Sequence, residues 1–467
     1  MSGGASSRLS AEQKAELLGR LSRQDARPSR PAVRPPARAR DGLSDLPHYQ
    51  QLQVMRTASA ALGIADPYFK VHEGRAGAET RIGERAYDNF SSYDYLGLNG
   101  HPAVAAAARE AIDRYGVSAS ASRLVAGERP LHQQLEARLA RFHGAEACLA
   151  FVSGHATNVT VIGSLLGRGD FVLHDELIHN SVLQGAQLSG ARRFGFEHNN
   201  VAAAEEMLKR HSAAAGRALI VIEGHYSMDG DLPDLPAFVD LARRYGAWLM
   251  VDEAHALGVV GATGRGVAEH FGVDPSEVDI WMGTLSKSLA SCGGYIAGRA
   301  EIVDYLRVSA PGFVYSVGLS PPLAAAALAA LEVLESEPER VRALNGAAGA
   351  FLASAKAAGL DTGRSQGFGI VPVITGGSIA AARLSQALFE AGVNVQPILY
   401  PAVPERSARL RFFLSCEHRS DQIERTVDLI RREWARIQVQ PADLQALTRM
   451  FEAVEPAGLR RSGPGTA

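Results

Sequence analysis

The chain of 467 residues is too long for one small core, so two or three packed domains are expected. Hydrophobic residues make up 46% and charged residues 21%, a globular balance that excludes a chain disordered throughout. The net charge of -2 excludes a broad basic field that would attract nucleic acid.

The first 45 residues differ in composition from the rest. Residues 27–40 are rich in proline and arginine and nearly free of apolar bulk, so we predict a disordered basic arm over 1–45. Within it, Ser10 can cap a short helix over 11–18. The arm is either a docking segment for an acidic partner or a solvated tail. The last residues, 456–467, are predicted to be a second disordered tail.

A globular N-terminal segment is predicted over 46–100. Residues 87–92 are typical of a strand that enters a turn. His101-Pro102 then begins an alanine-rich helix that extends to about Tyr115, because proline suits the first turn of a helix.

A large domain is predicted over 101–335, where short hydrophobic runs alternate with amphipathic stretches. Such runs are typical of strands buried on both faces of a mostly parallel sheet, and the stretches between them of right-handed helical crossovers. The candidate strands cover 147–151, 171–173, 218–222, 248–251, 280–282 and 294–297.

A long helix is predicted over 321–337, followed by a small C-terminal α/β domain over 336–455 with strands at 369–374 and 410–414. No apolar run approaches the roughly 20 residues that a transmembrane helix needs, and no signal peptide is seen.

Three cysteines, Cys148, Cys292 and Cys416, show no spacing typical of metal ligands or disulfides. Their pattern favours a reducing, cytoplasmic compartment. Cys292 lies close to Lys287 in sequence, and we expect it to be a small buried side chain rather than a reactive thiol.

Lys287 and Asp252 are the pair of residues that indicates a chemistry. Lys287 lies between Ser286 and Ser288, and a lysine in such a position can form a Schiff base with an aldehyde. Asp252 ends the hydrophobic run 248–251, where its carboxylate can keep a ring nitrogen protonated. These are the two needs of pyridoxal phosphate (PLP).

Other segments supply groups that PLP chemistry needs. Ser153, Gly154 and His155 follow a predicted strand and begin a helix, a pattern that suits phosphate binding, and Thr284 and Ser286 add hydroxyl groups. His174 or His179 could supply an imidazole that stacks on the ring. The remaining candidates are His255 and Ser227 near the phenolic oxygen, Ser316, and Arg411 as a clamp for a carboxylate.

Five stretches together resemble the α-oxoamine synthases, a family of PLP enzymes of fold type I. The family includes 8-amino-7-oxononanoate synthase, 5-aminolevulinate synthase and serine palmitoyltransferase. The likeness runs from about Phe90 to Ile430, and at Tyr93 the chain is most similar to serine palmitoyltransferases. The matching stretches cover 90–98, 226–231, 251–255, 264–266 and 283–287.

The resemblance implies an α/β fold with a seven-stranded, mostly parallel sheet and a homodimer with active sites at the interface. It also implies a role for each candidate residue. Lys287 would attach PLP, Asp252 would bind the ring nitrogen and His179 would stack on the ring. Ser227 and His255 would contact the phenolic oxygen. Gly154, His155, Thr284 and, from the second subunit, Ser316 would contact the phosphate, and Arg411 and Tyr93 would contact the substrate.

The expected activity is a decarboxylative condensation of serine, alanine or glycine with an acyl thioester, carried by CoA or by an acyl carrier protein. The product would be an α-aminoketone. An aminotransferase or another PLP lyase on the same fold is the alternative, because a fold does not fix the chemistry. A catalytically silent partner subunit, and a nucleic-acid or membrane-binding role for the arm, remain further readings. No metal is expected.

Overall fold

The computed structural model describes residues 42–211, 216–400 and 402–440. The predicted arm lies outside these residues except for its last four positions, as do the predicted helix at 11–18 and the tail at 456–467.

The chain falls into two compact units, Met1–Ala58 and Ser59–Ala467. The described part of the first unit holds a short 3-10 helix, η1 (Leu43–Asp45), and most of helix α2 (Pro47–Ala61). The predicted large and small domains both fall within the second unit, so the boundary near residue 335 stays a prediction.

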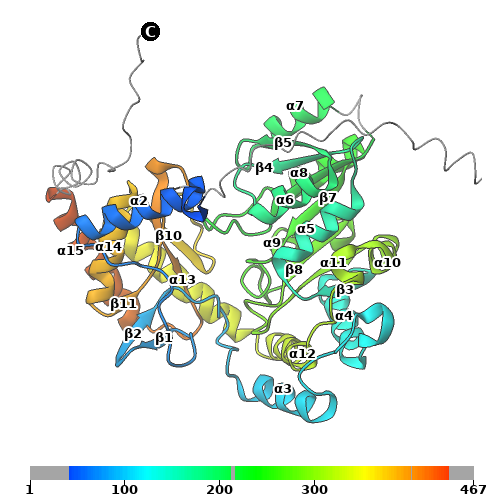
Figure 1. Ribbon diagram of the computed structural model, residues 1–467, viewed down its shortest axis with the longest axis horizontal. Coiled ribbons are helices and arrows are strands. Elements are labelled where there is room, and N and C mark those ends of the chain that lie inside the picture. The colour runs from blue at the N-terminus through cyan, green and yellow to red at the C-terminus, as the bar shows by residue number, and fades with distance from the viewer. Residues whose placement is uncertain (1–41, 212–215, 401, 441–467) are drawn as a thin grey trace, which may run out of the picture. The chain divides into compact units, whose positions relative to one another are not determined.

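Seven strands of the second unit form the main sheet in the order β3-β9-β8-β7-β6-β4-β5 (Figure 1). Neighbouring strands from β8 to β5 are parallel, whereas β9 is antiparallel to both β8 and β3. This arrangement confirms the predicted mostly parallel α/β sheet. The strands are β3 (Ala147–Phe151), β4 (Phe171–Asp175), β5 (Arg192–Phe196), β6 (Ala218–Glu223), β7 (Trp248–Asp252), β8 (Ile280–Thr284) and β9 (Gly294–Gly298).

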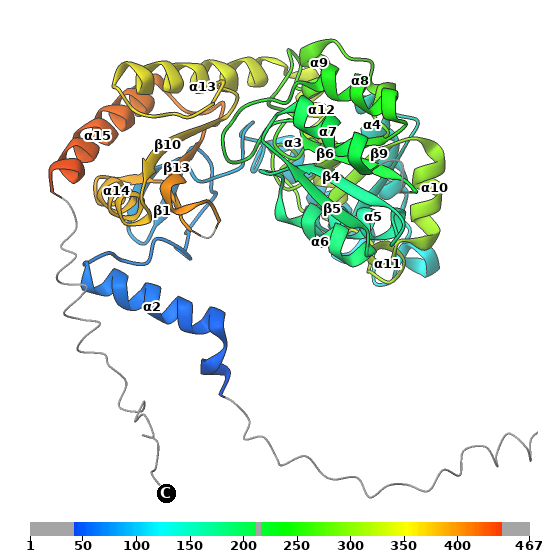
Figure 2. The same cartoon turned by 90° about the horizontal axis from the view of Figure 1, so that it is seen from above.

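Both faces of the sheet are buried, as the continuous apolar runs predict. In β6, Ile220 and Ile222 belong to one hydrophobic cluster, whereas Leu219 and Val221 belong to a second cluster. Helices therefore pack on both sides of the sheet (Figures 1 and 2). The helices of this region are α3 (Pro102–Tyr115), a π-helical turn η2 (Arg123–Gly127), α4 (Pro130–His143), α5 (Gly154–Leu165), α6 (Asn180–Ser189), α7 (Val201–His211), α8 (Leu235–Tyr245), α9 (Val267–Phe271), η4 (Pro275–Glu277), α10 (Ala300–Ser309), α11 (Pro311–Val314) and α12 (Pro321–Ser336).

The four central parallel strands all end in a polar residue. These residues are Asp175 in β4, Glu223 in β6, Asp252 in β7 and Thr284 in β8. The strands run one or two residues further than their apolar runs, which places these side chains at the carboxyl edge of the sheet, where α/β proteins bind ligands. Strand β5 was not predicted, because its edge position tolerates arginine and glycine and its sequence lacks a continuous apolar run.

Two smaller sheets complete the second unit. One has the antiparallel order β10-β13-β12, and the other has the order β1-β2-β11. Helix α13 (Glu339–Ala357) follows α12 and leads to these sheets (Figure 2). The other elements are β1 (Glu79–Ile82), β2 (Arg85–Asn89), β10 (Ile370–Gly376), α14 (Ser378–Glu390), β11 (Val393–Asn394), β12 (Pro397–Ile398), η5 (Glu405–Ser407), β13 (Ala408–Phe413) and α15 (Ser420–Val439).

Among the described residues, none of the helices combines the length and the apolar character needed to cross a membrane. All three cysteines are free. Cys148 is buried, but Cys292 is exposed, so the expectation that Cys292 is a buried side chain is wrong. It lies in the tight turn between Lys287 and β9, where Ala290 adopts a left-handed backbone conformation with φ of 47°. Such a turn leaves no room for the side chain in the core.

Candidate active site

A cavity of about 340 Å³ lies at the carboxyl ends of the central strands. It gathers side chains from β6, β7, β8, the start of α5 and the late strand β13. Every candidate site residue except His174 and Ser316 lines it. These residues are Tyr93, Ser153, Gly154, His155, His179, Ser227, Asp252, His255, Thr284, Ser286, Lys287 and Arg411.

Lys287 follows β8, and its side chain points into this cavity. Its Nζ atom lies 5.7 Å from the centre of the Tyr93 ring. Burial lowers the pKa of Lys287 to about 8, although the nearby carboxylates of Asp252 and Glu223 act in the opposite direction. An amine with this pKa is partly neutral at physiological pH, which is the form that attacks an aldehyde.

Asp252 ends β7 and is held by polar contacts on both of its oxygens. Its Oδ2 accepts a hydrogen bond of 2.9 Å from the Asn158 amide, and its Oδ1 accepts one of 3.0 Å from the Ala254 backbone. The Asn158 amide also donates to Ser181, whose hydroxyl lies 2.7 Å from Nδ1 of His179. A continuous polar network therefore links Asp252 to the histidine on the other side of the cavity.

Two of the three histidines that line the cavity, His179 and His255, are poor proton acceptors. Burial lowers the pKa of His179, which caps the N-terminus of α6. Burial also lowers the pKa of His255 far more strongly, and the positive charges of Lys287 and Arg411 reinforce that effect. Both imidazoles are therefore neutral near pH 7. His255 is fixed through Nδ1, which lies 2.8 Å from the Tyr95 hydroxyl.

The N-terminus of α5 forms a concave surface opposite β8. Ser153 caps the helix by accepting a hydrogen bond from the Ala156 backbone. A Cβ atom at Gly154 would lie 2.8 Å from Oγ1 of Thr284, so this position has no room for a side chain. The first amides of a helix lack partners within the helix, and beside two hydroxyl-bearing residues, Thr284 and Ser286, they suit an anion such as a phosphate ester.

The loop after β6 contributes Ser227 and is held by β13. The Ser227 backbone amide donates to Oε2 of Glu223 at 2.9 Å, and its carbonyl oxygen accepts from Nη1 of Arg411 at 2.7 Å. Nε of Arg411 is buried and has no partner among the described residues. Arg411 thus keeps one donor for a ligand while a second fixes the loop.

Glu223, Asn158 and Ser181 line the cavity but were not assigned roles from the sequence. Glu223 is buried at the end of β6, directly opposite Asp252 in the parallel register. Burial raises the pKa of Glu223 to about 8, and the charge of Asp252 adds to that effect. Its position just after an apolar run was the signal that could have identified it. Asn158 could have been found from its spacing, because it lies one helical turn after Gly154.

His174 and Ser316 do not line the cavity. His174 lies in β4, and its Nδ1 is 2.7 Å from the carbonyl oxygen of Asp175, so His179 is the histidine that reaches the cavity. Ser316 lies between α11 and α12, next to the exposed Tyr315 and Val317. Its proposed contact involves a second subunit and stays a prediction.

A second cavity of about 320 Å³ shares Tyr93 and Arg411 with the first. Its other lining residues include the apolar side chains of Phe69, Ile398 and Phe413. The two cavities therefore meet at Tyr93 and Arg411.

The cavity residues fit PLP in size and in chemistry. An amine, a carboxylate held at a strand end, an anion-binding helix start and neutral imidazoles surround one space. Two buried oxygens at its wall, Oε1 of Glu223 and Oδ1 of Asn158, have no partner among the described residues. Such unpaired buried atoms are costly unless a bound molecule or water satisfies them.

The chain matches the aminotransferase class I and II family over residues 87–430. It is 46% identical to the 8-amino-7-oxononanoate synthase of Geobacter sulfurreducens over 343 residues, which are 73% of this chain and 87% of that protein.

Solved structures are similar as well. A serine palmitoyltransferase from Sphingomonas wittichii is 31% identical with a TM-score of 0.81, covering 86% of this chain and 100% of that one. A serine palmitoyltransferase from S. paucimobilis with bound PLP is 29% identical with the same TM-score, covering 85% and 100%.

The Geobacter synthase and the two palmitoyltransferases represent two different members of one family. The predicted fold type, cofactor and reaction class are confirmed. This chain belongs to the α-oxoamine synthases, the PLP-dependent acyltransferases of the aminotransferase class I and II fold.

Proposed function

We propose that the cavity around Lys287 joins a small α-amino acid to an acyl thioester. The amino acid loses carbon dioxide, the thioester loses its thiol, and the product is an α-aminoketone. The observation that carries this proposal is that a buried amine, Lys287, and a strand-end carboxylate, Asp252, line one cavity together with a partly unpaired arginine, Arg411.

Bound PLP supplies an electron sink for the electrons released at the amino-acid Cα atom. The residues of the cavity would hold it from several sides. Asp252 would accept a hydrogen bond from the ring nitrogen and keep it protonated. His179 would stack on the ring, and Ser227 and His255 would contact its phenolic oxygen. The phosphate would be bound by Ser153, Gly154, His155 and Thr284.

Lys287 would hold the cofactor through its amine, and as a free amine it would take the proton from the Cα atom of the amino acid. At pH 7 an amine with a pKa of about 8 is ~10% neutral, far more than an ordinary lysine. Arg411 pairs with the substrate carboxylate and orients the Cα–H bond toward the base. After the new carbon–carbon bond has formed, that carboxylate leaves as carbon dioxide.

The second cavity offers a place for the acyl group. Phe69, Ile398 and Phe413 give it an apolar wall, and Tyr93 stands where it meets the first cavity. Glycine, serine and alanine all fit the proposal, and alanine is the first to test because the similar synthases are named for a product with a methyl-bearing aminoketone end. CoA and a carrier protein are both chemically suitable donors.

We also propose that the enzyme works as a homodimer in the cytoplasm, with Ser316 of each subunit completing the phosphate contacts of the other. Two segments, 117–125 and 315–320, support this proposal. They are joined by a hydrogen bond from Gly318 to the carbonyl oxygen of Ala121, and they carry several exposed apolar side chains. Three free cysteines fit a reducing compartment.

The decisive experiment incubates the purified full chain and PLP with glycine, alanine or serine and with CoA or carrier-protein thioesters of several chain lengths. Mass spectrometry identifies the ketone, and free thiol and carbon dioxide are measured in parallel. Equal amounts of aminoketone, thiol and carbon dioxide are expected. A keto acid without thiol release would identify an aminotransferase, and a purified protein unable to hold PLP would identify a silent subunit.

A further inference from the structure

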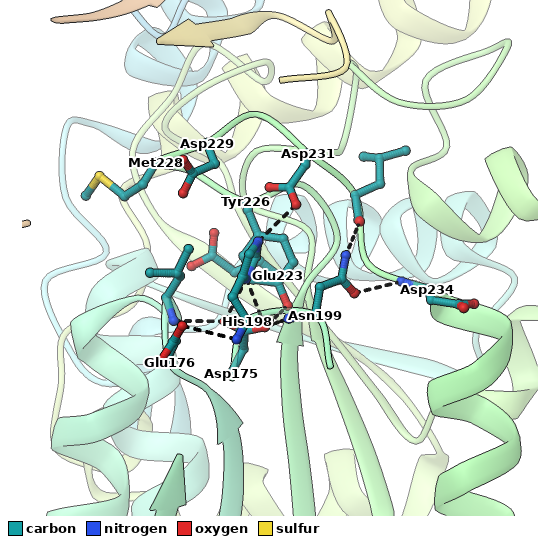
Figure 3. Close-up of polar contacts among 12 residues, drawn as sticks. Asp175, Glu176, His198, Asn199, Glu223, Tyr226, Met228, Asp229, Asp231 and Asp234 are labelled. Carbon is teal, nitrogen blue, oxygen red and sulfur yellow. Dashed lines mark hydrogen bonds and ion pairs between the residues drawn. The ribbon is translucent and has the colours of Figure 1, made fainter. Parts of the chain in front are cut away.

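A buried charge cluster lies beside the cavity but does not line it. His198, just after β5, has its Nδ1 at 3.0 Å from Oδ1 of Asp175 and its Nε2 at 2.9 Å from Oδ2 of Asp231 (Figure 3). All three side chains are almost completely buried. The cluster joins the ends of β4 and β5 to the loop that follows β6.

The geometry favours a charged imidazole. Each ring nitrogen of His198 faces a carboxyl oxygen, and an ionised carboxylate can only accept hydrogen bonds, so with both aspartates ionised both nitrogens carry a proton. Burial alone would lower the pKa of His198, but Asp175 and Asp231 raise it to about 10. The other groups that face it are the Tyr226 ring, at 4.4 Å between ring centres, and Glu176, which accepts from its backbone amide.

The cluster fixes the loop from both of its ends. The Tyr226 hydroxyl donates to Oδ2 of Asp175 at 2.9 Å, and the Tyr226 amide donates to the carbonyl oxygen of Asp231 at 2.9 Å. Next to His198, the Asn199 side chain donates to the carbonyl oxygen of Leu232 (Figure 3). The cluster of His198, Asp175 and Asp231 therefore holds both ends of the loop.

Between these fixed ends lie Ser227 and Met228, which line the cavity. Their carbonyl oxygens are held from the other side by Arg411 and Arg409 of β13. His198, Asp175 and Asp231 thus fix the loop on the side of the main sheet. Arg409 and Arg411 fix it on the side of the β10-β13-β12 sheet. A loop held this way presents its hydroxyl group without reorganisation.

We propose that His198 is a positioning residue, which holds the loop Tyr226–Asp231 through Asp175 and Asp231 and so sets the place of the Ser227 hydroxyl in the cavity. The inference rests on the proposed role of Ser227 toward the cofactor. Without the imidazolium, two carboxylates remain buried side by side, and their repulsion moves the loop. The Ser227 hydroxyl is then displaced from its place in the cavity.

The test compares His198→Gln, Asp231→Asn and Ser227→Ala in the full-length protein. The matched control is His143→Gln, another buried histidine of the main sheet region, whose Nε2 contacts the Tyr295 hydroxyl instead of the loop. Three quantities are measured: the dissociation constant of PLP from the reconstituted enzyme, the pH midpoint of the visible absorbance of bound PLP, and the melting temperature.

We expect His198→Gln and Asp231→Asn to weaken PLP binding about tenfold or more and to move the absorbance midpoint in the direction seen for Ser227→Ala. His143→Gln should lower the melting temperature and leave the other two quantities at wild-type values. If His198→Gln does not fold, Tyr226→Phe removes the hydroxyl contact to Asp175 and is judged by the same criteria.

Wild-type PLP affinity and midpoint in a folded His198→Gln protein would overturn the inference, even if its melting temperature is lower, since His198 would then serve stability alone. If Ser227→Ala itself leaves the midpoint unchanged, the proposed role of Ser227 fails. In that case the PLP dissociation constant of His198→Gln decides whether the cluster positions the loop.

Discussion

Burial acts in opposite directions on two neighbouring groups of the cavity. It lowers the pKa of Lys287 to about 8 and raises the pKa of Glu223 to about 8. Near neutral pH the lysine is therefore partly uncharged and the glutamic acid mostly protonated. The cavity thus avoids a second negative charge beside Asp252, and its lysine is prepared for both attachment and proton transfer.

Recovery of PLP by the apoenzyme should depend on the protonation of Lys287. We expect the recovery rate to rise about tenfold from pH 6 to 7 and to level off above pH 8, because the neutral amine is the reactive form. The measurement is the visible absorbance after mixing apoenzyme with PLP. Glu223→Gln should leave this profile nearly unchanged below pH 8, because the Glu223 carboxyl group is already mostly protonated there.

Two variants control this measurement. Lys287→Ala should never gain the absorbance of attached PLP and should lose activity, whereas Lys209→Ala, at an exposed lysine of α7, should match the wild type. A rate that keeps rising tenfold per pH unit above pH 9 would be the behaviour of an ordinary lysine and would contradict the lowered pKa of Lys287.

Arg411→Lys should raise the KM for the amino acid by about 10- to 100-fold, because a lysine cannot replace the planar guanidinium that pairs with a carboxylate. Arg409→Lys is the matched control. Arg409 holds the same loop, through Asp229 and the carbonyl oxygen of Met228, but does not line the cavity. Steady-state kinetics with varied amino acid separate the two. Equal KM changes in both variants would show that Arg411 acts through the loop alone.

The loop after β6 contacts both the main sheet and the β10-β13-β12 sheet. It holds Ser227 and Met228 at the cavity, and it contains Gly230, whose φ of 73° and close approach to the Ile370 carbonyl oxygen exclude a side chain. Charged residues fix it at both ends. Its position therefore depends on the charge of His198.

The free energy of unfolding should depend on the charge of His198. The pKa of His198 is about 10 in the folded state, above its ordinary value of 6.5, so its contribution is complete below pH 6.5 and is lost as pH rises toward 10. We expect the difference in unfolding free energy between wild type and His198→Gln to shrink across this window, with a slope of at most ~1.4 kcal/mol per pH unit. Urea unfolding at several pH values measures it. A constant difference from pH 6.5 to 10 would contradict a charged His198.

At the scale of the whole molecule, one group of the exposed apolar side chains found among the described residues lies on segments 117–125 and 315–320, the second of which contains Ser316. We name this set the exposed apolar patch. It consists of Val117, Leu124, Val125, Tyr315 and Val317. Large exposed apolar areas are typical of protein interfaces, and a two-fold axis would bring two copies of the same surface together.

If the proposed dimer forms through this patch, Val125→Glu should convert it to a monomer, because the substitution buries like charges in the interface, and the dimer dissociation constant should rise ~100-fold or more. PLP affinity should fall together with dimerisation if Ser316 acts across the interface. Analytical ultracentrifugation measures the first effect and PLP titration the second. Val439→Asp, at an exposed apolar residue near the end of α15, should leave both unchanged. An intact dimer in Val125→Glu would place the interface elsewhere.

Local sequence was sufficient to predict six of the seven strands of the main sheet and to identify two of the polar residues at their ends, Asp252 and Thr284. A buried parallel strand needs a continuous apolar run, and the chain ends such a run with Asp252 or Thr284 only where the side chain leaves the core. For that reason Lys287, Asp252 and the glycine turn at 154 could be grouped from spacing and chemistry. The edge strand β5 was not predicted, because an edge position does not require apolar residues.

The tertiary structure was needed wherever function depends on partners distant in the chain. No local pattern pairs His198 with Asp175 and Asp231, brings Arg411 of the last strand to the carbonyl oxygen of Ser227, or buries Glu223 opposite Asp252. Periodicity reports whether a side chain faces the core, whereas charge state and hydrogen-bond partners arise from groups that the folded chain brings close. Protonation within the cavity is therefore a property of the packed sheet and its loops.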